Sequence, residues 1–351
     1  MTEHEKKKRW KIILNVVTVL ALVVLVIFIW PQIQQTLDNL GRVNAYALLL
    51  IFPLQLANYE SYARMYRYLF GLLGNKLRHR DMFKVALELN LVNQVFPSGG
   101  VSGFSYFGVR MKDFDVSPGK STLVQSMKFV LLFISFEVLL VFGLLFLALG
   151  NQASNVVILV ASSIATFLLI GTVGAAVIIG SKTRINAFFT YITKFINKAI
   201  HIVRPKSPET ISVASVQRTF TELHENYVVL KKDYRQLLGP ALCALAANAT
   251  EIMCIYVVYI AFGHWVNPGA IILAYAIANF AGLVSVLPGG IGIYEALMTA
   301  VLATAGIPAS LSLPVTVMYR VINAVVQIIP GYYFYQKALH QRGNPPAPES
   351  A

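Results

Sequence analysis

The chain has 351 residues, of which 56% are hydrophobic and only 13% charged, and its mean hydropathy is +0.63. This composition excludes a soluble enzyme or a soluble binding module and predicts an integral membrane protein. The net charge of +13 would suggest nucleic-acid binding in a soluble chain, but here the basic residues lie between apolar stretches. We interpret them as loops beside a membrane and expect no nucleic-acid partner.

Six apolar stretches are long enough to cross about 30 Å of hydrocarbon as helices. They are residues 12–30, 43–62, 121–149, 155–180, 237–262 and 311–336. The first stretch is preceded by a basic segment, but no small-residue cleavage site comes after it, so we predict a retained span and not a signal peptide. The sequence therefore predicts an all-α integral membrane protein with about six full transmembrane helices.

The positions of lysine and arginine predict how the chain is oriented. The basic connections are the N-terminus, residues 64–84, 110–120 and 182–235, and the tail after 337. Connections 31–42, 150–154 and 263–268 hold one arginine among them. Because basic loops stay inside, we expect a multi-pass protein of the cell (inner) membrane with both termini in the cytoplasm.

We expect a single membrane domain made of two halves, residues 1–180 and 237–336, joined by a connector at 182–235. Apolar residues at helical spacing predict an interfacial helix over 185–203, and after it a second helix that packs on the cytoplasmic face or on its neighbouring helix. A dedicated site for a partner protein is the alternative interpretation of this helix pair. Residues 343–351 contain three prolines and are expected to be a disordered tail.

Two segments, residues 82–110 and 268–306, each join an apolar helix to a proline–glycine interruption. Proline removes a backbone donor and glycine loosens the chain, so each helix should break there into a re-entrant hairpin. The residues concerned are Asn93, Pro97, Gly99 and Gly100 in the first segment, and Asn279, Pro288, Gly289, Gly290 and Gly292 in the second.

The two interruptions also precede a basic residue at nearly the same distance. Lys128 lies 31 residues after Pro97 and Arg320 lies 32 residues after Pro288, which indicates a weak internal duplication. By the charge rule the first hairpin starts and ends inside and the second starts and ends outside. Inverted broken hairpins are typical of transporters, where helix N-termini favour anions in a shared cavity. The alternative is that proline and glycine only kink packed helices.

Ionisable residues within the predicted spans point to function or to ion pairing. They are Glu60, Lys128, Glu137, Glu251, Glu295 and Arg320, with Glu88 close to a span. Lys128 either extends to the interface or faces the interior. Arg320 should face a cavity or a carboxylate, and Glu295 is its expected partner. Together with Asn279 and Asn323 they would suit a phosphate group, whereas a purely structural ion pair is the competing interpretation.

No enzyme motif stands out, and we expect no catalytic residues, no metal and no cofactor. The six histidines are scattered over the tails and connections, and no histidine or cysteine cluster has metal-ligand spacing.

The interruption residues also carry a family resemblance. Residues 93–110 with their Pro-Ser-Gly-Gly core, and residues 286–320 with Leu-Pro-Gly-Gly-Ile-Gly-Ile-Tyr-Glu and a later Tyr-Arg, resemble the transmembrane region of lysylphosphatidylglycerol synthases. The resemblance covers most of the chain, although Ser102 and Gly103 depart from the family pattern. It implies a flippase-like domain without the aminoacyltransferase domain of the synthases. By motif position it assigns substrate binding to Pro288, Gly289, Gly290, Gly292, Glu295 and Arg320.

The leading hypothesis is passage of a lipid headgroup, on an aminoacylated or other phospholipid or a polyprenyl-linked lipid, between leaflets. The expected partners are membrane lipids. The alternative is a non-transporting membrane partner that organises a lipid or cell-envelope glycosyltransferase, which implies a cytoplasmic or membrane enzyme partner. An intramembrane enzyme acting on lipid phosphate lacks a recognisable nucleophile.

Overall fold

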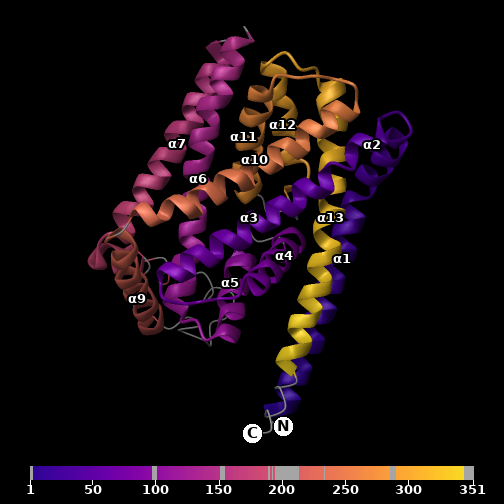
Figure 1. The fold of residues 1–351 in the computed structure, drawn as a ribbon. Coiled ribbons are helices and arrows are strands. Elements are labelled where there is room, and N and C mark those ends of the chain that lie inside the picture. The colour runs from indigo at the N-terminus through magenta and orange to yellow at the C-terminus, as the bar shows by residue number, and fades with distance from the viewer. Residues whose placement is uncertain are drawn as a thin grey trace.

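The fold is built from helices in every part of the chain that the structure describes (Figure 1). The structure is a computed structural model, and it describes residues 3–96, 101–150, 155–188, 190, 191, 193, 213–232, 234–284 and 290–343. The helices of the first half are α1 (Glu3–Leu40), α2 (Ala45–Leu48), α3 (Ile51–Leu72), α4 (His79–Val95), α5 (Val101–Met111), the 3₁₀ turn η1 (Lys112–Phe114), α6 (Pro118–Leu149) and α7 (Asn155–Ile179). The rest are α9 (Val213–Lys232), the 3₁₀ turn η2 (Tyr234–Leu237), α10 (Leu238–Ala261), α11 (Pro268–Val284), α12 (Ile293–Thr304) and α13 (Ala309–Gly343).

Five stretches are helical, long and apolar enough to cross a bilayer: Asn15–Leu40, Pro118–Leu149, Asn155–Ile179, Arg235–Ala261 and Ala309–Gln341. Large apolar side chains on α1 and α7 point outward, among them Ile27, Leu159 and Ile170 with exposed fractions of 66%, 69% and 66%. A soluble protein rarely exposes such a continuous apolar surface. The prediction of an all-α membrane protein is therefore confirmed.

Two predicted spans differ from the observed helices. Residues 43–62 do not form one span, because the chain forms α2, makes a turn at Leu49 and Leu50, and then continues in α3 as far as Leu72. Charged residues in α3 keep it out of the set of strongly apolar helices. The predicted first span, 12–30, is part of a longer helix that contains Pro31 and continues to Leu40. Proline removes one hydrogen bond, and flanking helical turns hold the chain in register.

The helices of the two halves occur in the same order and with similar lengths. In the first half α3, α4, α5 and α6 have 22, 17, 11 and 32 residues. In the second half α10, α11, α12 and α13 have 24, 17, 12 and 35 residues. A duplicated unit would give similar helix lengths in the same order. The internal duplication stays a prediction that these lengths support.

Helices of one half pack against helices of the other half. Helices α3 and α10 run antiparallel, since the Asn44 amide just before α2 donates to the Ala261 carbonyl at 2.9 Å and Tyr68 packs beside Gly239. We call α4 with α5, and α11 with α12, the two broken segments; α4 and α11 are their first arms. The long helix of each half packs against the first arm of the other half, α6 on α11 and α13 on α4. A glycine allows each close approach: Gly269 lies against the Gly143 carbonyl, and Gly331 lies against α4.

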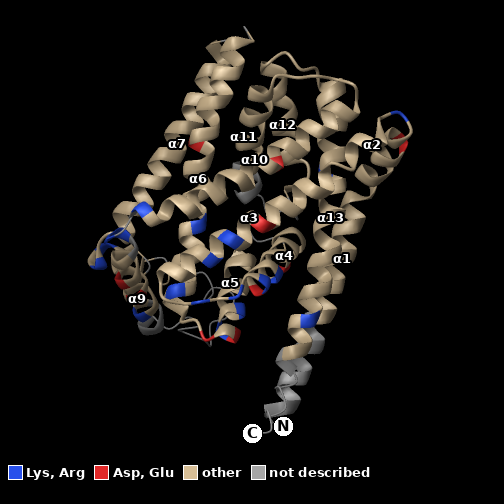
Figure 2. Ribbon diagram, in the orientation of Figure 1, with Lys and Arg blue, Asp and Glu red and all other residues tan. Residues whose placement is uncertain are grey.

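The two broken segments lie toward opposite ends of the bundle. In Figure 1, α4 and α5 lie toward the end where α1 begins and α13 ends, and α11 and α12 lie toward the other end. Lysine and arginine gather at the first of these ends, around α5, α9 and the start of α6, whereas the far ends of α6, α7, α11 and α12 carry none in Figure 2.

The connector packs onto the bundle through α9. Phe220, Leu223 and Tyr227 of this helix join an apolar cluster with Ile185, as expected for a helix that covers one face of the bundle. The Glu222 side chain accepts a hydrogen bond from Ser117 and another, at 3.1 Å, from the Gly119 amide at the start of α6. Residues 182–188 are helical, while 194–212 lie outside the described residues. Of the predicted disordered tail, 343–351, Gly343 ends α13 and the rest lies outside the described residues.

Candidate functional site

Arg320 lies within the apolar helix α13 and forms an ion pair with Glu295 of α12. Both side chains are largely buried, with exposed fractions of 11% and 6%. The Arg320 guanidinium also lies over the Tyr294 ring, 4.8 Å from its centroid. The predicted pairing of Arg320 with Glu295 is thus confirmed, and it joins the second arm of the broken segment to the spanning helix α13.

Glu295 also caps the start of its own helix, α12. Its carboxylate accepts a hydrogen bond of 2.7 Å from the Gly292 amide, three residues earlier, which caps the helix. Gly290 and Gly292 have φ angles of 69° and 85°, a conformation that favours glycine, so the turn into α12 depends on them. An internal carboxylate thus already accepts one backbone amide at this N-terminus, where the sequence predicts an anion.

A pocket of about 10 Å³, room for about one water molecule, adjoins this ion pair beside the interruptions of both segments. Gln94 lines it from the last turn of α4, and Ile291 lines it from the turn before α12. The other lining residues are Leu25, Ile29, Gln32, Arg320, Val321 and Ala324. The Gln32 amide of α1 donates to Glu295 at 3.0 Å, so two helices, α1 and α13, and the turn at Gly292 supply donors to one carboxylate.

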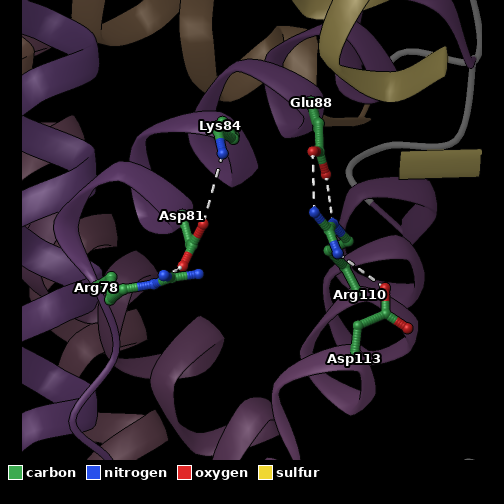
Figure 3. A network of polar contacts seen from close by, with 6 residues as sticks. All are labelled: Arg78, Asp81, Lys84, Glu88, Arg110 and Asp113. Carbon is green, nitrogen blue, oxygen red and sulfur yellow. Dashed lines mark hydrogen bonds and ion pairs between the residues drawn. The ribbon is translucent and has the colours of Figure 1, made fainter. Parts of the chain in front are cut away.

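A second buried ion pair joins the two arms of the first broken segment (Figure 3). Arg110 of α5 donates to both carboxylate oxygens of Glu88 in α4, at 2.8 and 3.4 Å, and to Asp113 at 2.8 Å. Tyr106 donates to Glu88 as well, at 2.8 Å. The nearby contacts of Asp81 with Arg78 and Lys84 are more exposed, and Arg78 is 87% exposed. The Glu88–Arg110 pair thus holds α4 and α5 together.

Asn323, which was predicted to lie with Arg320, belongs to a different cluster. Its amide donates to Glu251 of α10 at 3.3 Å, next to a 2.7 Å hydrogen bond from Tyr319 to the same carboxylate oxygen. Gln55 of α3 donates to the other oxygen at 3.2 Å. One turn of α13 therefore separates two polar sites, because residues 320 and 323 point toward different neighbouring helices.

Three other predicted residues do not reach Arg320. Lys128 is 8% exposed and lies among aromatic rings, with its Nζ 5.3, 5.8 and 5.2 Å from the centroids of Tyr62, Tyr66 and Phe129. It therefore does not extend to the interface, because the rings supply a favourable face for the cation. Two asparagines remain within their own segments: Asn279 donates to the Tyr275 carbonyl of its own helix, and Asn93 packs against Gly103 of α5.

Five predicted residues lie outside the described residues: Pro97, Gly99, Gly100, Pro288 and Gly289. Sequence reasoning missed Gln32, Gln94 and Tyr294, which surround the Arg320–Glu295 pair. The available signal was a neutral amide or a tyrosine inside or beside an apolar stretch, and such residues are too common to single out without their contacts. Among the described residues no three histidine, cysteine, aspartate or glutamate side chains are grouped as metal ligands would be.

Comparison with known proteins agrees with this architecture. Residues 12–331 match the family model described as the lysylphosphatidylglycerol synthase TM region. A UPF0104 membrane protein of Methanocaldococcus jannaschii is 21% identical over 316 residues, which cover 89% of this chain and 90% of that protein. Another, of Methanothermobacter thermautotrophicus, is 33% identical over 73 residues, only 22% of its length. The match to one of Pyrococcus horikoshii is 26% identical and spans 30% of its length. Since the family model extends over most of the sequence, the chain belongs to the family of the lysylphosphatidylglycerol synthase TM region.

Proposed function

We propose that this protein moves a lipid headgroup between the leaflets of the membrane, with Arg320 as the group that binds the lipid phosphate. The observation that carries the proposal is a buried arginine of a membrane-spanning helix that lines a small pocket beside the interruptions of both segments. An arginine in that position is costly unless a partner or a polar cavity compensates its charge. A phosphate is a partner that a guanidinium binds well, through two parallel hydrogen bonds.

The internal carboxylate suggests how binding and release are balanced. In the structure Glu295 takes the place of an anion, since it accepts from Arg320, from Gln32 and from the Gly292 amide. An entering phosphate would compete with Glu295 for Arg320 and Gln32, so the headgroup would exchange one set of hydrogen bonds for another. Such an exchange keeps the site from holding the lipid too tightly, which a transporter requires. The acyl chains would stay in the bilayer, beside the apolar outer faces of α1 and α13.

The arrangement of the broken segments supports a path that is open to either side in turn. Helices α4 and α5 lie toward the basic end of the bundle and α11 and α12 toward the opposite end (Figures 1 and 2). With the basic end in the cytoplasm, the two segments are re-entrant hairpins of opposite orientation and both termini are cytoplasmic. Inside the hydrocarbon layer, helix ends whose backbone groups lack hydrogen bonds are tolerated only where they are buried in protein or line a water-filled cavity.

The test is leaflet exchange in liposomes that contain the purified protein and a fluorescent phospholipid, with chemical quenching of the outer leaflet as the readout. Fluorescent phosphatidylglycerol, its lysyl ester, phosphatidylethanolamine and a polyprenyl phosphate are compared. Protein should accelerate exchange of at least one of them over empty liposomes. The proposal fails if none is accelerated while circular dichroism shows folded protein.

Two variants separate a binding role from a structural ion pair. Arg320→Gln should abolish exchange, because neutral glutamine no longer attracts the phosphate. Glu295→Gln should retain it, since a glutamine oxygen still accepts from the Gly292 amide while the competing charge is gone. The matched control is Arg64→Gln, which removes an arginine that is 60% exposed and paired with Glu60. Equal loss in both test variants, with intact folding, would indicate a structural pair.

The competing function is a membrane scaffold for an envelope enzyme that would bind the basic connector. The observation in its favour is the exposed apolar pair Val228 and Val229 on α9, with exposed fractions of 40% and 53%. Deleting the whole connector would also remove the buried residues Ile185 and Leu223, so substitution of Val228 and Val229 by serine is the cleaner test. A scaffold should lose its partner in this variant, whereas lipid exchange should continue.

A further inference from the structure

Glu251 is a buried carboxylate within the membrane-crossing helix α10, and it takes no part in the site around Arg320. It is 8% exposed, and it belongs to no ion pair among those that the described residues form. Its hydrogen-bond donors are all neutral: Gln55, Tyr319 and Asn323. An ionised carboxylate without a cation is costly inside a membrane. Protonation removes that cost.

The side chains around Glu251 suit both of its protonation states. In the structure the amides of Gln55 and Asn323 turn their N–H groups toward the carboxylate, and their oxygens, Gln55 Oε1 and Asn323 Oδ1, have no partner in the described part of the chain. Gln55 is fully buried, so bulk solvent does not reach this oxygen. Turning either amide over presents its oxygen instead, which would accept the proton of a neutral Glu251. The same two amides can therefore donate to ionised Glu251 or accept the proton of neutral Glu251.

The groups that face Glu251 from the packed helices are tyrosines and one thiol. Tyr319 of α13 donates to Glu251, and Cys254 of its own helix accepts from the same Gln55 amide at 3.6 Å. The other titratable groups nearby are Tyr59 and Tyr62 of α3, Tyr275 of α11 and Tyr294 of α12. Tyr294 also lies under the Arg320 guanidinium, and its hydroxyl has no partner among the described residues. Glu251 is thus joined to the Arg320 site through α13, because Tyr319 donates to Glu251 and the next residue, Arg320, pairs with Glu295.

We propose that Glu251 is a proton-binding site that couples lipid movement to the proton gradient. One proton binds the carboxylate from one side of the membrane and leaves from the other, and no other group is consumed. The amides of Gln55 and Asn323 and the Tyr319 hydroxyl are the hydrogen-bond partners of the carboxyl group in both states. The coupling rests on the proposed lipid transport, whereas the binding of the proton does not.

Proton binding is tested without any lipid assay, by infrared difference spectra of the reconstituted protein between acidic and alkaline buffer. The carbonyl band of a protonated buried carboxyl group should appear in acid, disappear in Glu251→Gln, and remain in the control Glu60→Gln, whose carboxylate is 32% exposed. Gln55→Leu should shift the frequency of this band, because it removes a hydrogen-bond partner. A spectrum unchanged by Glu251→Gln overturns the proposal.

Coupling is tested in the liposome assay with an imposed pH gradient. One proton per lipid should sustain about a tenfold ratio of labelled lipid between the leaflets for each pH unit. Glu251→Gln should still exchange lipid but reach equal distribution. A sodium gradient that drives accumulation in place of the pH gradient would overturn the proposal. If the wild type moves no lipid yet its Glu251 band titrates, proton binding stands and the proposed transport is refuted.

Discussion

Loss of the Arg110 side chain should destabilise the protein more than almost any other single change to its polar groups. The Glu88 side chain is 1% exposed, and Arg110 supplies two of its hydrogen bonds together with the compensating positive charge. Replacing Arg110 by methionine roughly keeps the volume but leaves that buried carboxylate without its cation, which costs about 3–5 kcal/mol. Glu88→Gln should cost less, about 1.5–3 kcal/mol, because Arg110 retains Asp113 at 2.8 Å.

The measurement is reversible unfolding in mixed micelles with increasing SDS, monitored by circular dichroism. Arg78→Met is the matched control, since Arg78 is 87% exposed and its pair with Asp81 should contribute less than about 1 kcal/mol. The double variant Glu88→Leu with Arg110→Met should be more stable than Arg110→Met alone, because no charge remains buried. The reasoning is refuted if Arg110→Met costs no more than Arg78→Met.

Three other changes are predicted from the packing. Gly269→Leu should lower the free energy of unfolding by about 3 kcal/mol, because the new Cβ would collide with the Gly143 carbonyl oxygen. The control Gly174→Leu places its Cβ in open space and should be neutral in the same SDS titration. Asn248→Leu removes hydrogen bonds of 3.2 and 3.0 Å to α6 and should cost about 1–2 kcal/mol, and a cost near zero would show that they contribute nothing. Glu222→Gln weakens the contact of α9 with the start of α6, so limited proteolysis should cut the connector faster, and an unchanged rate would argue against this contact as the anchor.

The sequence by itself determined the class of the protein and the positions of most of its membrane-crossing helices. Long uncharged runs can cross a bilayer only as helices, because no water is present there to satisfy the backbone. The pairing of Arg320 with Glu295 was also predictable, since a charge within an apolar run needs a compensating group and few were available. The family could be recognised from the proline–glycine strings, whose spacing is local information.

Only the tertiary structure decided which polar residues share a site. Asn323 lies one helical turn from Arg320 and yet bonds Glu251, because α13 touches α12 on one side and α10 on the other. Likewise Gln32 and Gln94 reach the Arg320 pocket from helices that are distant in sequence. The capping of α12 by Glu295 depends on the φ angle of Gly292, which no periodicity encodes. Helical spacing fixes the direction of a side chain on its own helix, whereas its partner depends on which helices pack around it.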